Sequence, residues 1–239
     1  MTEPAPDLFN QTRSQRAYRG LSPEQRSLER KQRLLAAALE LFAGQGYANT
    51  TIEQLCATSK VTARHFYALF ANREALLTEL YNTIVDDLRD AVAEAISAPE
   101  LALSAKLELA VQALITQYLR DARRARIGVL ESVGVSTAME QRRRAAIHDI
   151  ARVIESFLDA LVMQGELPTH DYHLVSIAIV GGINELLADW LTRAVPPGIE
   201  HLGQEVTRIL NALIRGSAER PSQAPENLNR TTAPERRKP

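Results

Sequence analysis

A short run of polar side chains between Thr62 and Tyr67 has the residue types and spacing to bind DNA. On a helix, the outward face of this run consists of Thr62, Arg64, His65 and Tyr67. Hydroxyl, guanidinium and imidazole groups can reach phosphate oxygens or base edges when such a helix enters the major groove. The run therefore predicts a recognition helix from about Thr62 to Leu69.

A supporting helix must hold this recognition helix in place. Thr50 and Glu53 form a T-x-x-E pattern, which is typical of a capping box and predicts that the supporting helix starts there. Apolar residues recur at helical spacing on both sides of the polar break Thr58-Ser59-Lys60. These residues are Ile52, Leu55 and Cys56 before the break, and Val61, Phe66 and Phe70 after it. Two short helices joined by a tight turn form a helix-turn-helix.

The segment from Gln32 to Leu77 carries a series of motifs in one order. They comprise Leu34, Ala37, Ala38, Leu41, Phe42, Gly46 and Tyr47, then Thr51, Ile52, Val61, Thr62, Tyr67 and Phe70, and finally Arg73, Glu74 and Leu76. Together they resemble the N-terminal domain of the TetR family of bacterial transcriptional regulators. The sequence departs from the family pattern at Lys60 and Arg64, where Gly is usual, and at Leu69, where an aromatic residue is frequent. The turn needs a left-handed backbone, which Lys60 adopts less easily than Gly would. Arg64 adds a guanidinium to the reading face.

The resemblance implies that the partner is double-stranded DNA with a palindromic operator, bound by a homodimer. The DNA contacts that we expect are Thr51, Thr62, Ala63, Arg64, His65, Tyr67 and Arg73. Residues 1–21 contain few apolar positions and predict a flexible basic arm. Its arginines, Arg13, Arg16 and Arg19, could neutralise phosphates or enter the minor groove, or they could be solvated charge.

Composition indicates a soluble chain with a sizeable core. The 239 residues have a net charge of −1, and no stretch approaches the uncharged apolar length that a membrane span needs. The N-terminus lacks the apolar run of a signal peptide, so we expect a cytoplasmic protein that does not contact a membrane. The single cysteine, Cys56, lies on an apolar face and is interpreted as a small buried hydrophobe.

Helical periodicity continues through the rest of the chain, and no strand signal is found. Helices are expected from Ser22 to about Ala43, from Asn72 to Pro99 at the latest, over 103–119, 127–133 and from 137 to about 164, then from Asp171 to Ala194 and over 199–216. The basic segment Arg120 to Arg126 is interpreted as a solvated corner. The predicted fold class is all-α: a three-helix helix-turn-helix domain (22–73) joined by a long helix to a helical ligand-binding and dimerisation domain (74–216). Residues 217–239 predict a disordered tail.

No catalytic constellation, metal site or cofactor motif is recognised, so no enzyme, metal or cofactor is expected. His170, Asp171 and His173 could suggest metal ligands, but they are interpreted as a surface loop beside Pro168. Inward residues could line an effector pocket or could be ordinary core. The pocket candidates are Tyr81, Tyr118, Phe157, Asn184 and Trp190.

The resemblance implies a homodimeric, sequence-specific transcriptional regulator, and most of the family work as repressors released by a small-molecule effector. We expect that effector to be largely apolar. The alternative is an all-helical small-molecule-binding protein or enzyme whose N-terminal unit mediates protein contacts.

Overall fold

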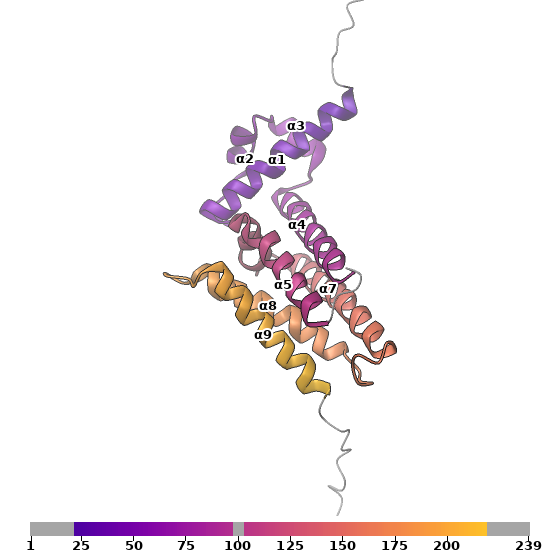
Figure 1. Cartoon of the computed structure of the whole chain (residues 1–239). Coiled ribbons are helices and arrows are strands. Elements are labelled where there is room, and N and C mark those ends of the chain that lie inside the picture. The colour runs from indigo at the N-terminus through magenta and orange to yellow at the C-terminus, as the bar shows by residue number, and fades with distance from the viewer. Residues whose placement is uncertain (1–21, 98–102, 219–239) are drawn as a thin grey trace, which may run out of the picture.

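A computed structural model describes residues 22–97 and 103–218, and within these ranges the chain forms helices and no strand. The N-terminal helices are α1 (Pro23–Gln45), α2 (Ile52–Ser59) and α3 (Ala63–Leu69). They gather at one end of the molecule, and α4 (Arg73–Ile96) leads from them into a helical bundle (Figure 1). The predicted all-α fold class is confirmed.

Local capping signals set the starts of α1 and α4. Ser22 and Gln25 form the expected capping box, with the Ser22 amide donating to Gln25 Oε1 at 2.8 Å. Asn72 caps α4 by accepting a hydrogen bond from the Ala75 amide. Both helix starts were predicted because each depends on residues within one turn of the helix.

The start of α2 differs from the prediction by one residue. Thr51 rather than Thr50 is the N-cap, and its capping-box partner is Gln54 rather than Glu53. Thr50 is fully buried, and its hydroxyl donates to the Gly46 carbonyl at 2.9 Å. Thr50 therefore closes the turn after α1, and its hydroxyl does not cap α2.

Lys60 ends α2 in the left-handed conformation that the turn requires, with φ 55° and ψ 38°. Among the described residues it alone has a positive φ without being glycine. A left-handed backbone costs an L-residue about 1–2 kcal/mol. The turn thus keeps its geometry despite the substitution of the usual glycine.

The long helix α4 runs through a hydrophobic core that extends from the N-terminal helices into the bundle. Its buried residues recur at the spacing of one helix face: Leu76, Leu77, Leu80, Tyr81, Ile84, Val85, Leu88, Val92 and Ile96. One end packs on α1 of the N-terminal unit, and its length packs on α5 (Leu103–Leu119) and α7 (Thr137–Met163). A displacement of α4 would therefore be felt in both units.

The segment after α5 is more regular than expected. Instead of a solvated corner followed by one short helix, it forms α6 (Ala122–Arg126) and a π-helical turn, η1 (Ile127–Glu131). Its arginines engage nearby carboxylates, as in the 2.5 Å pair of Arg124 with Asp87 of α4. Single π-helical turns inside helices are rare and often occur at functional sites.

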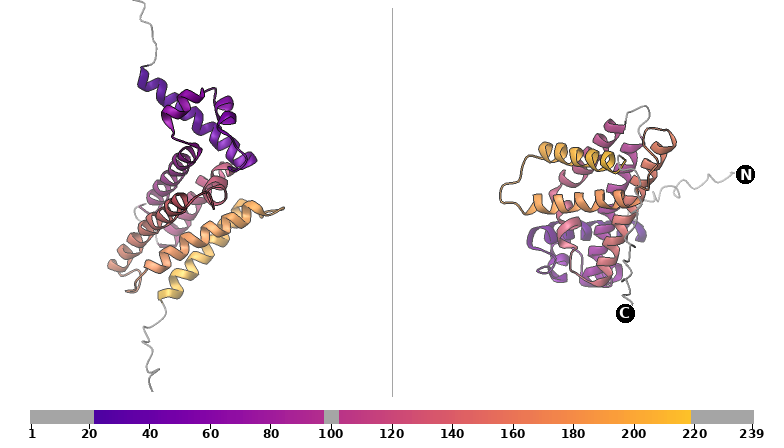
Figure 2. Two further views of the ribbon diagram at one scale, coloured as in Figure 1. Left: turned by 180° about the vertical axis from the view of Figure 1, so that it is seen from behind. Right: turned by 90° about the horizontal axis from the view of Figure 1, so that it is seen from below.

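The two last helices, α8 (His173–Thr192) and α9 (Ile199–Ala218), lie side by side along one flank of the bundle (Figure 2). Asp171 accepts a hydrogen bond from the His173 amide at 3.0 Å, so α8 begins two residues later than predicted. A Cβ added to Gly181 or Gly182 would meet no atom within 4 Å. No close approach of another described element therefore explains this glycine pair within the protomer.

Helix α8 is long and apolar enough, by length and composition alone, to cross a membrane, with a mean hydropathy of 1.5 over its most apolar window. It nevertheless contains Glu185 and Asp189 and packs on α7, η1 and α9. Only 28% of that window is buried in the protomer. The other apolar residues of α8 are mostly half-buried, and Leu174 is the large apolar side chain of this helix that the described residues leave exposed.

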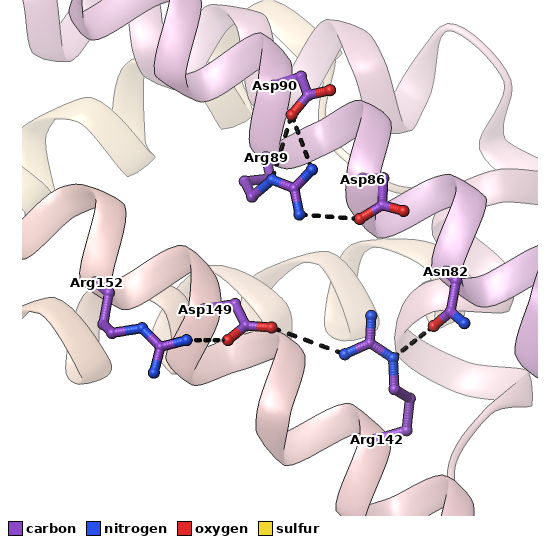
Figure 3. A network of polar contacts seen from close by, with 7 residues as sticks. All are labelled: Asn82, Asp86, Arg89, Asp90, Arg142, Asp149 and Arg152. Atoms are coloured by element: carbon purple, nitrogen blue, oxygen red, sulfur yellow. Dashed lines mark hydrogen bonds and ion pairs between the residues drawn. The ribbon is translucent and has the colours of Figure 1, made fainter.

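Polar contacts fasten α4 to α7 at the bundle surface. Arg142 of α7 donates from Nε to Asn82 Oδ1 of α4 at 2.5 Å and lies 3.8 Å from Asp149 of its own helix (Figure 3). Asp149 also pairs with Arg152. Asn82 of α4 and Asp149 of α7 thus hold the Arg142 guanidinium between the two helices.

Candidate functional site

The outward face of α3 is open to solvent. Ala63 and Arg64 are exposed, and the Tyr67 side chain is 59% exposed. Phe66 and Phe70 are buried beneath them and fix the helix to the N-terminal core. Because the apolar face is anchored, α3 presents its polar face in a defined orientation.

Arg64 forms no ion pair within the described part of the chain, so its guanidinium is available to a partner. Thr62 and His65 are coupled instead: Thr62 Oγ1 lies 2.9 Å from His65 Nδ1. Thr51 is exposed, but its hydroxyl accepts the Gln54 amide, so its side chain is partly committed to the helix cap. Arg64 and Tyr67 are the freest of the expected contacts.

Arg73, expected to contact DNA, also makes structural contacts within the protein. Its guanidinium donates to the Thr50 carbonyl and lies 4.3 Å from the centre of the Tyr47 ring. It thereby ties the start of α4 to the loop between α1 and α2. A phosphate contact at Arg73 would share a guanidinium that already has backbone acceptors. Arg13, Arg16 and Arg19 lie outside the described residues.

Glu131 of the π-helical turn connects the two units. Its Oε2 accepts the Tyr47 amide at 2.9 Å, and its Oε1 accepts Arg126 Nε at 3.1 Å. Tyr47 lies in the loop after α1, so this contact spans 84 positions of sequence. A second link joins Ser136 Oγ to Glu74 of α4 at 2.5 Å. The N-terminal unit is thus tied to the bundle through η1 as well as through α4.

An apolar cavity of about 50 Å³ lies inside the bundle. Its walls come from α4, α5, α7, α8 and α9, and include Leu88, Ile154 and Leu210 together with three of the expected residues, Tyr118, Phe157 and Asn184. Ligand pockets usually measure about 300–1,000 Å³. A sizeable effector would therefore have to move these walls apart.

Two expected pocket residues lie elsewhere. Tyr81 lines a separate cavity of about 10 Å³ next to the apolar one. Trp190 lines neither cavity and donates from Nε1 to the Pro197 carbonyl at 2.8 Å, which fixes the connection between α8 and α9. Sequence reasoning also missed Arg143, which lines the smaller cavity, because it lies in the basic run Arg142–Arg144 and resembles solvated charge.

Exposed apolar residues lie on both α8 and α9, among charged ones such as Glu185 and Arg208. Leu174 of α8 is 74% exposed, and Ile209 and Leu213 of α9 are 39% and 40% exposed. Leu210, by contrast, is only 6% exposed and lines the apolar cavity. Leu210 is therefore part of the protomer core, although it lies on one of the two last helices of the expected dimerisation domain.

Comparison with known proteins agrees with this architecture. The family described as bacterial regulatory proteins, tetR family, matches residues 34–80, and the tetracyclin repressor-like C-terminal domain matches residues 100–214. The transcriptional regulator YhgD of Bacillus subtilis is 24% identical over 166 residues, which cover 69% of this chain and 85% of YhgD. TcmR of Streptomyces glaucescens is 45% identical over 51 residues, covering 21% of this chain and 23% of TcmR.

Solved structures share the fold at low sequence identity. A TetR-family regulator from Syntrophomonas wolfei has a TM-score of 0.70 at 19% identity and covers 79% of this chain and 96% of its own. FadR from Bacillus subtilis, solved in complex with stearoyl-CoA, has a TM-score of 0.68 at 19% identity, covering 77% of this chain and 98% of its own. With a helix-turn-helix at one end, a helical bundle at the other and both family domains matched in order, the chain belongs to the TetR family of bacterial transcriptional regulators.

Proposed function

We propose that this regulator acts as a homodimeric repressor that a small-molecule effector releases from a palindromic operator. The observation that carries the proposal is that the exposed face of α3 and the cavity in the bundle are connected by the same two elements, α4 and η1. An exposed reading face with a free Arg64 lies on α3, and a cavity lies in the bundle between α4 and the helices that surround it.

The apolar flank of α8 and α9 supports the dimer. Leu174, Ala178 and Gly182 recur every four residues on the exposed side of α8, and Ile209 and Leu213 follow the same spacing on α9. Small residues on one helix allow a second helix to approach closely, which gives a physical reason for Gly182 within a helix. A two-fold axis through this flank would pair each surface with its own copy. Two recognition helices could then meet successive major grooves, about 34–36 Å apart.

Tyr118, Gly128 and Glu131 supply a physical route for effector release. Tyr118 borders the cavity, and its ring packs so closely on η1 that a Cβ at Gly128 would lie 3.0 Å from it. Glu131, at the end of the same turn, holds the Tyr47 amide. An effector larger than the cavity would push Tyr118 and η1, and the pull on Tyr47 would alter the position of the N-terminal unit. Release then follows from a population shift between two arrangements of the dimer.

The walls of the cavity favour an effector with a large apolar part. FadR, which shares the fold, was solved in complex with stearoyl-CoA, so compounds with a long acyl chain are the first to examine. The alternative function, an enzyme or binding protein with an N-terminal protein-contact unit, leaves the free guanidinium of Arg64 without a role.

The decisive experiment selects DNA from a random pool with the purified full-length protein. We expect an enriched palindrome, bound by two chains and with an affinity that falls steeply as salt increases. Enrichment of no sequence, with retention independent of salt, would support the protein-contact alternative.

A further inference from the structure

A second, polar cavity adjoins the apolar one. It measures about 10 Å³, room for about one water molecule, and Tyr81, Tyr118, Arg143 and Asn184 contribute its polar side chains. Tyr118 and Asn184 also line the apolar cavity. Ile150 and Val180 line both cavities as well, so the two spaces are neighbours that share these walls. A ligand that filled both would be apolar at one end and polar at the other.

Arg143 brings an unsatisfied donor to the polar cavity. Its Nε is buried without a hydrogen-bond partner among the described residues, whereas its Nη1 donates to Glu140 Oε2 at 2.9 Å. A buried donor of a charged group is costly to leave unpaired. The Nε therefore requires an acceptor that the described chain does not supply.

Two tyrosine hydroxyls complete the donor set. No hydrogen bond between described residues uses the hydroxyl of Tyr81 or of Tyr118. Burial raises the pKa of both phenols, and the charge of Arg143 opposes this increase in each. Both hydroxyls therefore stay protonated at neutral pH and can donate, as the amide of Asn184 also can.

The charges around the cavity favour an anion. Besides Arg143, the charges of Arg142, Arg124 and Glu140 act on Tyr81 or Tyr118. Arg144 follows Arg143 on α7 and is exposed. Arg142 is occupied by Asn82 and Asp149 (Figure 3), and Arg124 by Asp87. Glu140 is shared between Arg143 and the Gly134 amide. The guanidinium of Arg143 is thus the cation whose free donor lies at the cavity.

We propose that Arg143, Tyr118 and Asn184 bind the carboxylate of an amphipathic effector whose apolar part occupies the adjoining cavity. A carboxylate suits the site better than a phosphate because it is the smaller anion and because a single guanidinium, already shared with Glu140, provides the charge. Since the polar cavity has room for about one water molecule, its walls, like those of the apolar cavity, would have to move apart. This proposal deepens the effector-responsive function proposed above and rests on it.

The test measures binding to the full-length protein without DNA, by calorimetry. Probes are straight-chain carboxylic acids from butanoate to octadecanoate, each paired with the primary alcohol of the same length. For the best-fitting length we expect the acid to bind at least about tenfold more tightly than its alcohol, since a hydrogen bond to a charged group is among the stronger ones. Arg143→Gln should abolish this preference while leaving the affinity for the alcohol within about threefold of the wild type.

Arg144→Gln is the matched control, because it removes the same charge from an exposed neighbour outside the cavity. It should retain the preference for the acid, and Tyr118→Phe should reduce that preference without abolishing it. If Arg143→Gln is unstable by circular dichroism, Arg143→Lys and Tyr118→Phe carry the comparison, and both should weaken the acid selectively. Equal binding of acid and alcohol at every length, or equal losses in the Arg143 and Arg144 variants, would show that the cavity holds water only. Since no DNA is present, this failure would leave the DNA-binding part of the proposed function intact.

Discussion

At the residue scale, Arg64 is the side chain with the greatest freedom to read a base. It projects from the first turn of α3, the part of a recognition helix closest to the base edges, and no carboxylate of the described chain holds it. Arg64→Ala should lose discrimination at one guanine per half-site by about 1–3 kcal/mol. Non-specific affinity should remain nearly unchanged. Anisotropy titrations with matched and substituted operators give the answer, and equal weakening of both would make Arg64 a phosphate anchor.

Arg73 combines a structural contact with its expected phosphate contact. Arg73→Ala removes the donor to the Thr50 carbonyl and the cation from the Tyr47 ring. We expect a loss of about 1.5–3 kcal/mol in the free energy of unfolding, the usual range for a hydrogen bond to a charged group. Binding should weaken on all sequences, with the salt slope reduced by about one counterion. Urea denaturation and salt titrations separate the two effects: unchanged stability argues against the structural contact, and an unchanged slope against the phosphate contact.

At the scale of the element, the π-helical turn η1 depends on a glycine. A Cβ at Gly128 would lie 3.0 Å from Tyr118 Cε1 and 3.1 Å from its hydroxyl oxygen. Gly128→Ala should therefore destabilise the protein by about 1–3 kcal/mol, the usual cost of overpacking a core. Its control is Gly44→Ala in α1, where an added Cβ meets nothing within 4 Å and should stabilise the helix by about 0.5–1 kcal/mol. Thermal unfolding measures both variants. If the melting temperature of Gly128→Ala rose as that of Gly44→Ala should, the close packing on Tyr118 would be unimportant for stability.

The same turn connects the units through its last residue. Glu131→Ala should leave the Tyr47 amide without its acceptor and free the guanidinium of Arg126. We expect hydrogen exchange at the Tyr47 amide to accelerate about tenfold or more, because the lost bond is charge-assisted. Glu94→Ala, an exposed carboxylate of α4 without an ion pair between described residues, is the control and should leave that exchange rate unchanged. A protected Tyr47 amide in the Glu131 variant would mean that η1 does not hold the N-terminal unit.

At the scale of the whole molecule, the flank of α8 and α9 distinguishes a residue of the protomer core from a residue of the proposed dimer seam. Leu213→Glu places a charge on an exposed apolar site and should give a folded monomer. Burying this unpaired charge in a dimer seam would cost on the order of several kcal/mol across the two copies. Leu210→Glu places the same charge inside the protomer and should unfold the bundle. Sedimentation and circular dichroism tell these outcomes apart. A folded dimer of Leu213→Glu would place the interface on another surface.

The sequence by itself determined the features that depend on neighbours within a turn or two. Local hydrogen bonds and helical periodicity account for the caps at Ser22 and Asn72, the buried stripe of α4 and the exposed polar face of α3. The family motifs lie in the same segment, from Leu34 to Leu76, so the helix-turn-helix was predictable to within a residue at most boundaries.

Only the tertiary structure decided which of two similar local signals is used and which side chains meet across the fold. Thr50 and Thr51 both precede a plausible capping partner. The Thr50 hydroxyl donates to the Gly46 carbonyl, and the Thr50 carbonyl accepts a hydrogen bond from Arg73, 23 positions away in sequence. Thr51 therefore caps the helix. Arg143 resembles its two arginine neighbours in sequence, and Trp190 resembles a pocket aromatic. In the packed bundle, Arg143 of α7 lines a cavity. The indole of Trp190 instead donates a hydrogen bond to the Pro197 carbonyl in the connection between α8 and α9. Such choices depend on contacts between residues distant in sequence, whose energies no local pattern encodes.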